Sequence, residues 1–205
     1  MHLLRNAIET GNLLLDLQCH ELNDLYEHVL NHIVNEGLMP SEVKNSALTQ
    51  LRDNEQNTNS AIGHSVAIPH AYLDDLTESI IYFVRLKKPI NLGAGDGIAT
   101  RFVFFMLGPK SATSEHLNTL ASIATLVGDD EFRYAIGNCQ SQTEFINAID
   151  QFKLRHPLKF SDESVQSSDA PKHNGLEYTG KLFGGLRQDI ARRLPHYWSD
   201  FADGF

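Results

Sequence analysis

Residues 60–70 read SAIGHSVAIPH and carry the clearest structural signal in the chain. A turn containing Gly63 leads into the short apolar run Val66-Ala67-Ile68, which is typical of a strand. Pro69 then restricts the backbone, so that His70 is presented at the end of this strand. We therefore interpret His70 as a positioned side chain and as a candidate for chemistry.

A second histidine stands at the start of a predicted helix. Residues 114–117 read SEHL, which places His116 in the first turn, where unpaired backbone N–H groups and the helix dipole favour an anion. A neutral imidazole can act as a nucleophile, and a second imidazole can donate to phosphoryl oxygens. The pattern predicts a phosphoryl site at His70 and His116, with Ser60 and His64 in the phosphate environment. From the residues alone, two unrelated surface histidines are the commoner outcome.

Apolar periodicity predicts alternating helices and strands around these histidines. Apolar side chains recur every three or four positions from Leu22 to Ile33, as one helical face requires, and a second helix follows Pro40. Short apolar runs predict strands at residues 79–86 and 101–107, and further helices are expected at residues 114–128 and 141–152. The expected fold is α/β, with a sheet of parallel or mixed strands covered by helices on both faces.

The composition describes a globular protein and excludes several classes of function. The 205 residues include 26 acidic and 17 basic side chains, and the net charge of −9 disfavours non-specific nucleic-acid binding. The longest apolar stretches are far shorter than the roughly 18 residues that a membrane-spanning helix needs. Residues 1–11 show no secretion-signal pattern, so a cytoplasmic location is expected.

Disulfide and metal chemistry are not expected from the sequence. Cys19 and Cys139 are 120 positions apart without a CxxC pair, which argues against a disulfide framework or a structural zinc site. His28 and His32 are spaced i, i+4 on a predicted helix and could chelate a metal, but sequence spacing places no third ligand with them. A partly solvated helix face explains the pair better, and we expect no metal and no cofactor.

The composition changes after residue 158. Residues 1–158 form the predicted α/β domain, and residues 159–175, with four serines, form a predicted flexible linker. Residues 176–205 form a third segment, in which Leu182, Leu186 and Ile190 share one helical face. Its basic residues, called here the tail bases, are Lys181, Arg187, Arg192 and Arg193. Bases on the cytoplasmic side of a membrane span follow the positive-inside tendency, so this helix is a candidate juxtamembrane segment. A solvated amphipathic helix packed on its own domain is the alternative.

Residues 51–152 resemble the enzyme IIA domain, fructose and mannitol type, of the bacterial phosphotransferase system. The resemblance rests on Ile62-Gly63, Ala67 to His70, Gly93-Ala94 with Asp96-Gly97, Val103 to Leu107 followed by Pro109, and His116-Leu117 through Leu120-Ala121. It implies an enzyme IIA fold and a histidine of the Ile-Pro-His motif that a histidine-containing phosphocarrier protein phosphorylates, with a supporting histidine beside it. Those roles fall on His70 and His116.

Three positions depart from that family's pattern. Asn54-Glu55 stands where the family usually carries arginine and glutamate, and Arg52 comes two positions early. Ala71 replaces a glycine after the active histidine, and His64 replaces a small or amide residue after the turn glycine. Losing a fixed cation beside a dianionic phosphoryl group weakens its electrostatic stabilisation, so we expect weak or absent phosphotransfer.

The tail is similar to the segment before the first membrane helix of anion exchangers and bicarbonate cotransporters, the band 3 family. The matching residues are YTGKLFGGL at 178–186, Asp189-Ile190, Arg192-Arg193 and PHYWSDF at 195–201. This resemblance implies the cytoplasmic amino-terminal domain of a bacterial bicarbonate or anion transporter, a domain whose fold is itself similar to enzyme IIA. It also implies a homodimer, a membrane domain as partner and a location at the cytoplasmic face of the inner membrane.

Three functions stay open at this point. The leading one is a regulatory and dimerisation domain of a bicarbonate or inorganic-anion transporter, with no turnover of its own. The second is an active phosphocarrier in which His70 accepts a phosphoryl group, and the third is a nitrogen-regulatory type of protein that signals by binding partners. They do not exclude one another, because phosphorylation of His70 could gate a transporter.

Overall fold

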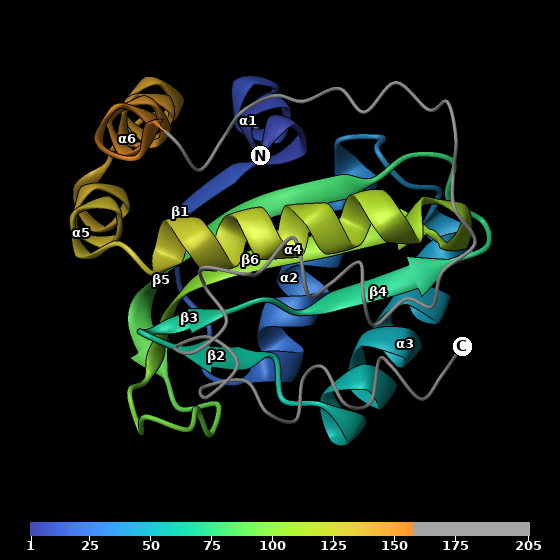
Figure 1. Ribbon diagram of the computed structural model, residues 1–205. Helices are drawn as coiled ribbons and strands as arrows, with labels where there is room; N and C mark the ends of the chain where they lie inside the picture. Colours follow the sequence, from blue (N-terminus) through green and yellow to red (C-terminus); the bar gives the residue numbers. More distant parts are fainter. Residues whose placement is uncertain (158–205) are drawn as a thin grey trace, which may run out of the picture. The chain divides into compact units, whose positions relative to one another are not determined.

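The computed structural model describes residues 1–157, which form a central sheet with helices on both faces (Figure 1). The helices are α1 (His2–Glu9), α2 (Leu22–Asn35), α3 (Lys44–Asn57), α4 (Thr113–Val127), α5 (Asp130–Asn138) and α6 (Gln142–Arg155), with short 3-10 turns at Ser41–Val43 and Lys110–Ala112. The strands are β1 (Leu13–Leu17), β2 (Ala61–Gly63), β3 (Val66–Ala67), β4 (His70–Leu73), β5 (Ile80–Ile90) and β6 (Thr100–Pro109).

The sheet is mixed in direction and is built around the two long strands. The strand order is β1-β5-β6-β3-β2, and β4 also pairs with β6. β5 and β6 are antiparallel, whereas β1 pairs with β5, and β3 and β4 pair with β6, in parallel. β3 lies along Phe102 and Val103, and β4 lies further along the same strand, with His70 opposite Met106. One edge of β6 therefore carries both short strands that flank Pro69.

One face of the sheet packs against α2 and α3, which lie behind it in Figure 1. Successive side chains of a strand point to opposite faces, so every second residue of β5 and β6 enters this core. Tyr26 of α2 meets Phe105 of β6 with ring centroids 6.1 Å apart. His32 packs edge-on against Tyr82 of β5 with centroids 5.5 Å apart. The core on this face thus consists of the helical faces that apolar spacing predicted.

The opposite face of the sheet is covered by α1, α4, α5 and α6, with α4 lying across the front of the sheet in Figure 1. Aromatic rings fill this layer, because Phe83 contacts Phe104 at 5.2 Å and Phe145 of α6 at 4.7 Å between centroids. Phe145 in turn meets Phe132 of α5. Both long strands are therefore buried on both sides, which explains their nearly unbroken apolar sequence.

A buried arginine ties β5 to β1 and to the C-terminal end of α5. The Arg85 side chain is 1% exposed and forms an ion pair of 2.9 Å with Asp16 of β1. Its guanidinium also donates to the backbone carbonyls of Ile136, Gly137 and Cys139, the last at 2.6 Å. A buried cation is tolerated only when paired and hydrogen-bonded, and this set of acceptors meets that requirement.

The predicted fold class, an α/β sheet covered by helices on both faces, is confirmed. The sequence-based description was incomplete in that it did not name α1, β1, β2, β4 or α5. His70, predicted at a strand end, is the first residue of β4, and Ile68 and Pro69 separate β4 from β3. The predicted linker and the predicted juxtamembrane segment lie outside the described residues.

Candidate functional site

His70 is held in place by its backbone. The side-chain amide of Asn54 in α3 donates to the carbonyl oxygen of His70 at 2.9 Å. The ring nitrogen Nδ1 of His70 lies 3.0 Å from the carbonyl oxygen of Ile68. If Nδ1 carries the proton, it donates to that carbonyl, and Nε2 is the unprotonated ring nitrogen. The local geometry thus presents an imidazole nitrogen that is able to act as a nucleophile.

His116 comes from the first turn of α4 and is fully buried, with 0% exposure. Its ring centroid lies 6.2 Å from that of His70 and 4.7 Å from that of Tyr72. The ring packs against Gly108 of β6, where an added Cβ would come within 2.7 Å of its Nδ1. A glycine at this position therefore makes room for the imidazole. The structure brings His70 and His116 together, although 46 residues of sequence separate them.

Both histidines are held in the neutral form near pH 7. The pKa of His116 is lowered from 6.5 to about 4. Burial is the main cause, and the neighbouring His70 is the second. Burial also lowers the pKa of His70, and its bond to the Ile68 carbonyl and the nearby Glu55 carboxylate oppose this effect. A neutral pair supplies a nucleophile but no positive charge, so it offers little compensation for a dianionic phosphoryl group.

Several buried polar atoms of His116 and its neighbours lack hydrogen-bond partners among the described residues. Within residues 1–157, both ring nitrogens of His116, Oη of Tyr72 and Oγ of Ser79 are buried and have no hydrogen-bond partner. Tyr72 pairs with Gly108 across β4 and β6, and an added Cβ on Gly108 would lie 3.3 Å from Oγ of Ser79, so these groups share one neighbourhood. Buried polar groups are usually hydrogen-bonded, so this cluster of exceptions is a candidate functional site.

Of the two residues predicted as the phosphate environment, Ser60 bonds to Ile68 and Glu55, which also contact or face His70, whereas His64 lies further from the histidine pair. The Ser60 carbonyl accepts from the Ile68 N–H at 2.8 Å, and its own N–H faces the Glu55 carboxylate. His64 lies in the turn between β2 and β3 at a φ of +54°, and its N–H donates to Asp96 at 2.7 Å. Along β6, the partners of Val66 and His70 are four residues apart, which corresponds to roughly 13 Å, and His64 lies beyond Val66.

The arginine that precedes Asn54 does not take over the missing positive charge. Arg52 donates through Nε to Asn23 at 2.9 Å and pairs with Glu27 of α2 at 3.6 Å. Those partners lie on α2, whereas Asn54, one helical half-turn further on, faces His70. The position that resembles the family's arginine thus carries a neutral amide that binds the backbone of the candidate site.

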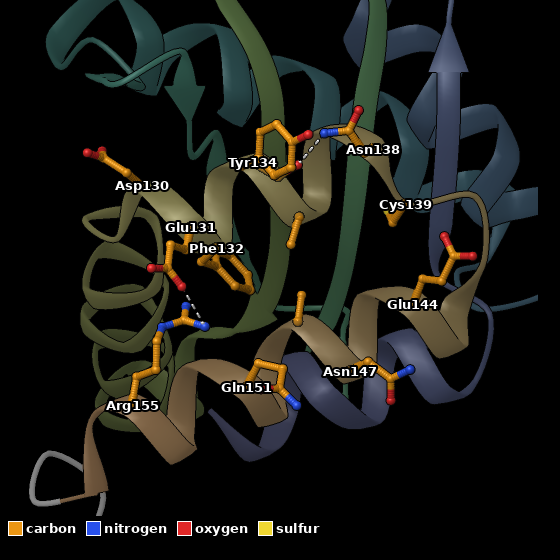
Figure 2. Close-up of a pocket in the computed structure, with 12 residues that line it drawn as sticks. Asp130, Glu131, Phe132, Tyr134, Asn138, Cys139, Glu144, Asn147, Gln151 and Arg155 are labelled. Carbon is orange, nitrogen blue, oxygen red and sulfur yellow. Dashed lines mark hydrogen bonds and ion pairs between the residues drawn. The ribbon is translucent and has the colours of Figure 1, made fainter.

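A separate pocket of about 790 Å³ lies between α5 and α6 (Figure 2). Figure 2 shows Arg155 of α6 reaching Glu131 of α5, an ion pair of 3.1 Å, while Glu144 and Asn147 lie toward the other end of the pocket. Neither His70 nor His116 lines it. The sequence-predicted site and this pocket are therefore different places on the domain.

The tail bases Lys181, Arg187, Arg192 and Arg193 lie outside the described residues. Up to residue 157, the helices are too short and too polar to cross a bilayer.

Comparison with known proteins identifies the family. Residues 8–152 match the family described as the phosphoenolpyruvate-dependent sugar phosphotransferase system, EIIA 2. Because this match spans well over half of the chain, the chain belongs to that family. It also extends the resemblance seen in the sequence toward the amino terminus, over β1 and α2.

The chain is also similar to bicarbonate transporters. The sodium-driven chloride bicarbonate exchanger of Homo sapiens is 28% identical over 65% of this chain and 15% of the exchanger. The electrogenic sodium bicarbonate cotransporter 1 of Ambystoma tigrinum is 25% identical over 98% of this chain and 29% of the cotransporter. The chain thus spans less than a third of the length of these relatives. The resemblance to enzyme IIA is thus confirmed as family membership, and the resemblance to bicarbonate transporters is confirmed as a sequence similarity.

A solved structure has the same fold. The nitrogen regulatory protein IIA-Ntr from Neisseria meningitidis superposes with a TM-score of 0.64 at 22% identity, over 72% of this chain and 99% of that one.

Sequence reasoning missed three residues that shape the site. Asn54 was noted only as a departure from a family pattern, whereas it binds the His70 backbone. Tyr72 and Gly108, which contact the ring of His116, were not singled out. A glycine inside an apolar strand is a recognised sign of a close approach, and Gly108 was therefore detectable in principle.

Proposed function

We propose that residues 1–157 form a regulatory and dimerisation domain of a bicarbonate or inorganic-anion transporter, at the cytoplasmic face of the inner membrane. Two independent lines support this proposal. The chain belongs to the EIIA 2 family by sequence, and it is similar to bicarbonate transporters over most of its length. A domain of this kind acts through binding and conformation, without turnover of its own.

The observation that carries the proposal is the state of the histidine pair. His116 has no exposed surface, and burial lowers its pKa to about 4, so its ring is neutral and enclosed. Asn54 occupies the position where a cation would stabilise phosphoryl transfer, and it binds the His70 carbonyl. The fold of a phosphocarrier is present, while the electrostatic support for phosphoryl transfer is weak.

The transporter's membrane domain is the proposed partner, and the tail bases are the proposed connection to it. Four bases with one opposing acid, Asp189, lie between Lys181 and Trp198. Bases beside a span favour the cytoplasmic side and attract anionic head groups. In this proposal the segment from 176 to 205 is the juxtamembrane helix, and residues 159–175 link it to the domain.

The transporter proposal is tested by reading the coding sequence beyond codon 205. We expect a series of long apolar segments, each of roughly 20 residues, as a polytopic membrane domain requires. A stop codon at that point would exclude the proposal. Dimerisation is tested by sedimentation equilibrium at micromolar concentrations, where we expect a symmetric dimer, the commonest soluble assembly. A monomer at all concentrations would contradict the dimerisation role.

The alternative is a phosphocarrier that accepts a phosphoryl group on His70 from the histidine-containing phosphocarrier protein. It is favoured by the 6.2 Å separation of the two imidazoles. The test is incubation with labelled phosphoenolpyruvate and the two general phosphotransferase proteins, using wild type, His70→Ala and, as a matched control, His64→Ala. We expect no label above background in any of the three. Label that disappears only in His70→Ala would establish the alternative.

A further inference from the structure

Three side chains with metal-binding atoms meet where the loop after β1 joins α2. Cys19 lies in that loop and is 3% exposed, Asp24 lies in the first turn of α2, and His28 lies one turn later. One ligand atom from each residue lies within 4.8 Å of the other two. The sequence supplied His28 as a candidate ligand but gave no sign that the chain folds Cys19 back over the same turn.

The carboxylate and the imidazole already contact each other in this arrangement. The backbone N–H of His20 donates to Oδ2 of Asp24 at 3.0 Å, which anchors the loop to the helix. Nδ1 of His28 lies 2.9 Å from Oδ1 of Asp24 and 2.7 Å from the Asp24 carbonyl oxygen. These contacts hold the imidazole and the carboxylate next to each other before any ion binds.

The spacing of the three ligand atoms suits a small tetrahedral ion. Zinc bonds of about 2.0 to 2.3 Å place neighbouring ligand atoms roughly 3.5 Å apart. Because the three atoms lie within 4.8 Å of one another, they need to approach by at most about 1.3 Å. The side chains of Asp24 and His28 are 28% and 50% exposed, so they are free to make that adjustment and to admit an ion from solvent.

We propose that Cys19, Asp24 and His28 bind one divalent transition-metal ion of the zinc type, with water in the fourth position. A thiolate and an imidazole select such ions over magnesium or calcium, which prefer oxygen ligands. Binding forms a sulfur–metal bond, and the thiol proton leaves to solvent. The thiolate and the carboxylate then balance the two positive charges of the ion.

His32, the other half of the histidine pair seen in the sequence, is not part of this site. Its ring packs edge-on against Tyr82 of β5. It is therefore a matched control for His28, because it lies on the same helix one turn further on. Cys139, the second free cysteine, lies after α5 and is the matched control for Cys19.

The test is titration of the metal-free, reduced 205-residue chain with Co²⁺ alone, followed by displacement with Zn²⁺. We expect one equivalent of Co²⁺ to produce a thiolate-to-cobalt charge-transfer band and the visible bands of a tetrahedral site, and Zn²⁺ to remove both. Cys19→Ala should abolish the charge-transfer band, and Asp24→Asn and His28→Gln should weaken Co²⁺ binding at least about tenfold. His32→Gln and Cys139→Ala should leave the titration unchanged.

Thermal unfolding separates lost binding from lost folding. Zn²⁺ should raise the thermal-unfolding midpoint of wild type, His32→Gln and Cys139→Ala, and it should raise the midpoint of folded Cys19→Ala and His28→Gln by clearly less. The proposal is overturned if Co²⁺ gives no charge-transfer band with wild type. It is also overturned if the band survives Cys19→Ala, or if His32→Gln weakens binding as much as His28→Gln does.

Discussion

Replacing His116 with methionine should remove a large part of the acid sensitivity of the domain. His116 is completely buried, and its pKa is lowered from 6.5 to about 4. Because the folded-state pKa lies below the unfolded-state pKa, His116 is neutral in both states above pH 7 and has no effect on stability there. As the pH falls below 6.5, only the unfolded state takes up the proton, and the folded state loses stability.

The magnitude follows from the gap between the two pKa values. A gap from 6.5 to about 4 corresponds to about 3.4 kcal/mol of unfolding free energy when it is complete. Of this, about 2 kcal/mol is lost between pH 7 and pH 5. Methionine has a similar volume and no titrating group. It also removes two unpartnered ring nitrogens, so at pH 7 the change in stability should stay within about 1 kcal/mol.

The assay is urea unfolding of residues 1–205 at pH 7.0, 6.0 and 5.0, with wild type, His116→Met and the exposed control His2→Met. Other groups contribute to the acid sensitivity of all three proteins, so the informative quantity is the difference between each variant and wild type. His116→Met should gain about 2 kcal/mol on wild type between pH 7 and pH 5, whereas His2→Met should gain almost nothing. Parallel pH curves for wild type and His116→Met would refute the argument that burial depresses this pKa.

Three further predictions test other contacts. Gly108→Ala places a Cβ within 2.7 Å of Nδ1 of His116, so the unfolding free energy measured in urea should fall by about 1 to 3 kcal/mol. Most of that decrease should disappear when Gly108→Ala is compared in a His116→Ala background. Arg85→Met leaves Asp16 and three backbone carbonyls without their buried donor, so the unfolding free energy should fall by about 3 kcal/mol or more. An unchanged urea midpoint would contradict this prediction. Replacing the three tail arginines, Arg187, Arg192 and Arg193, with glutamine should weaken binding of the chain to anionic vesicles at low salt by up to about 1 kcal/mol per base. Equal binding by both proteins, or binding that does not depend on salt, would remove the electrostatic part of the juxtamembrane hypothesis.

The parts of the fold that could be predicted are those with a strong repeating pattern. β5 and β6 are long and apolar on both faces, and α2, α4 and α6 repeat apolar residues every three or four positions, so burial alone made them visible. α1, β1 and α5 are short, with eight, five and nine residues, and much of what buries them comes from partners distant in the sequence. Propensity is too weak to identify elements of that length.

The histidine pair shows a second limit. His70 and His116 are brought together by the parallel pairing of β4 with β6 and by α4 crossing the sheet, which no local pattern records. The resemblance to enzyme IIA indicated their adjacency, but it said nothing about how deeply His116 would be buried. Burial of an imidazole depends on which side chains close over it, here Tyr72 and the space left by Gly108. The burial of His116 therefore depends on the three-dimensional packing of residues distant in the sequence.

The central proposal, a regulatory domain of a bicarbonate or anion transporter, is tested most directly by anion flux. The protein expressed from the complete coding sequence that contains these 205 residues would be reconstituted in lipid vesicles, with and without residues 1–157, at equal amounts of membrane domain. We predict that bicarbonate added outside alkalinises the vesicle lumen, and that deletion of residues 1–157 changes the rate. An absence of bicarbonate flux in the complete protein, or an identical rate with and without the domain, would contradict the proposal.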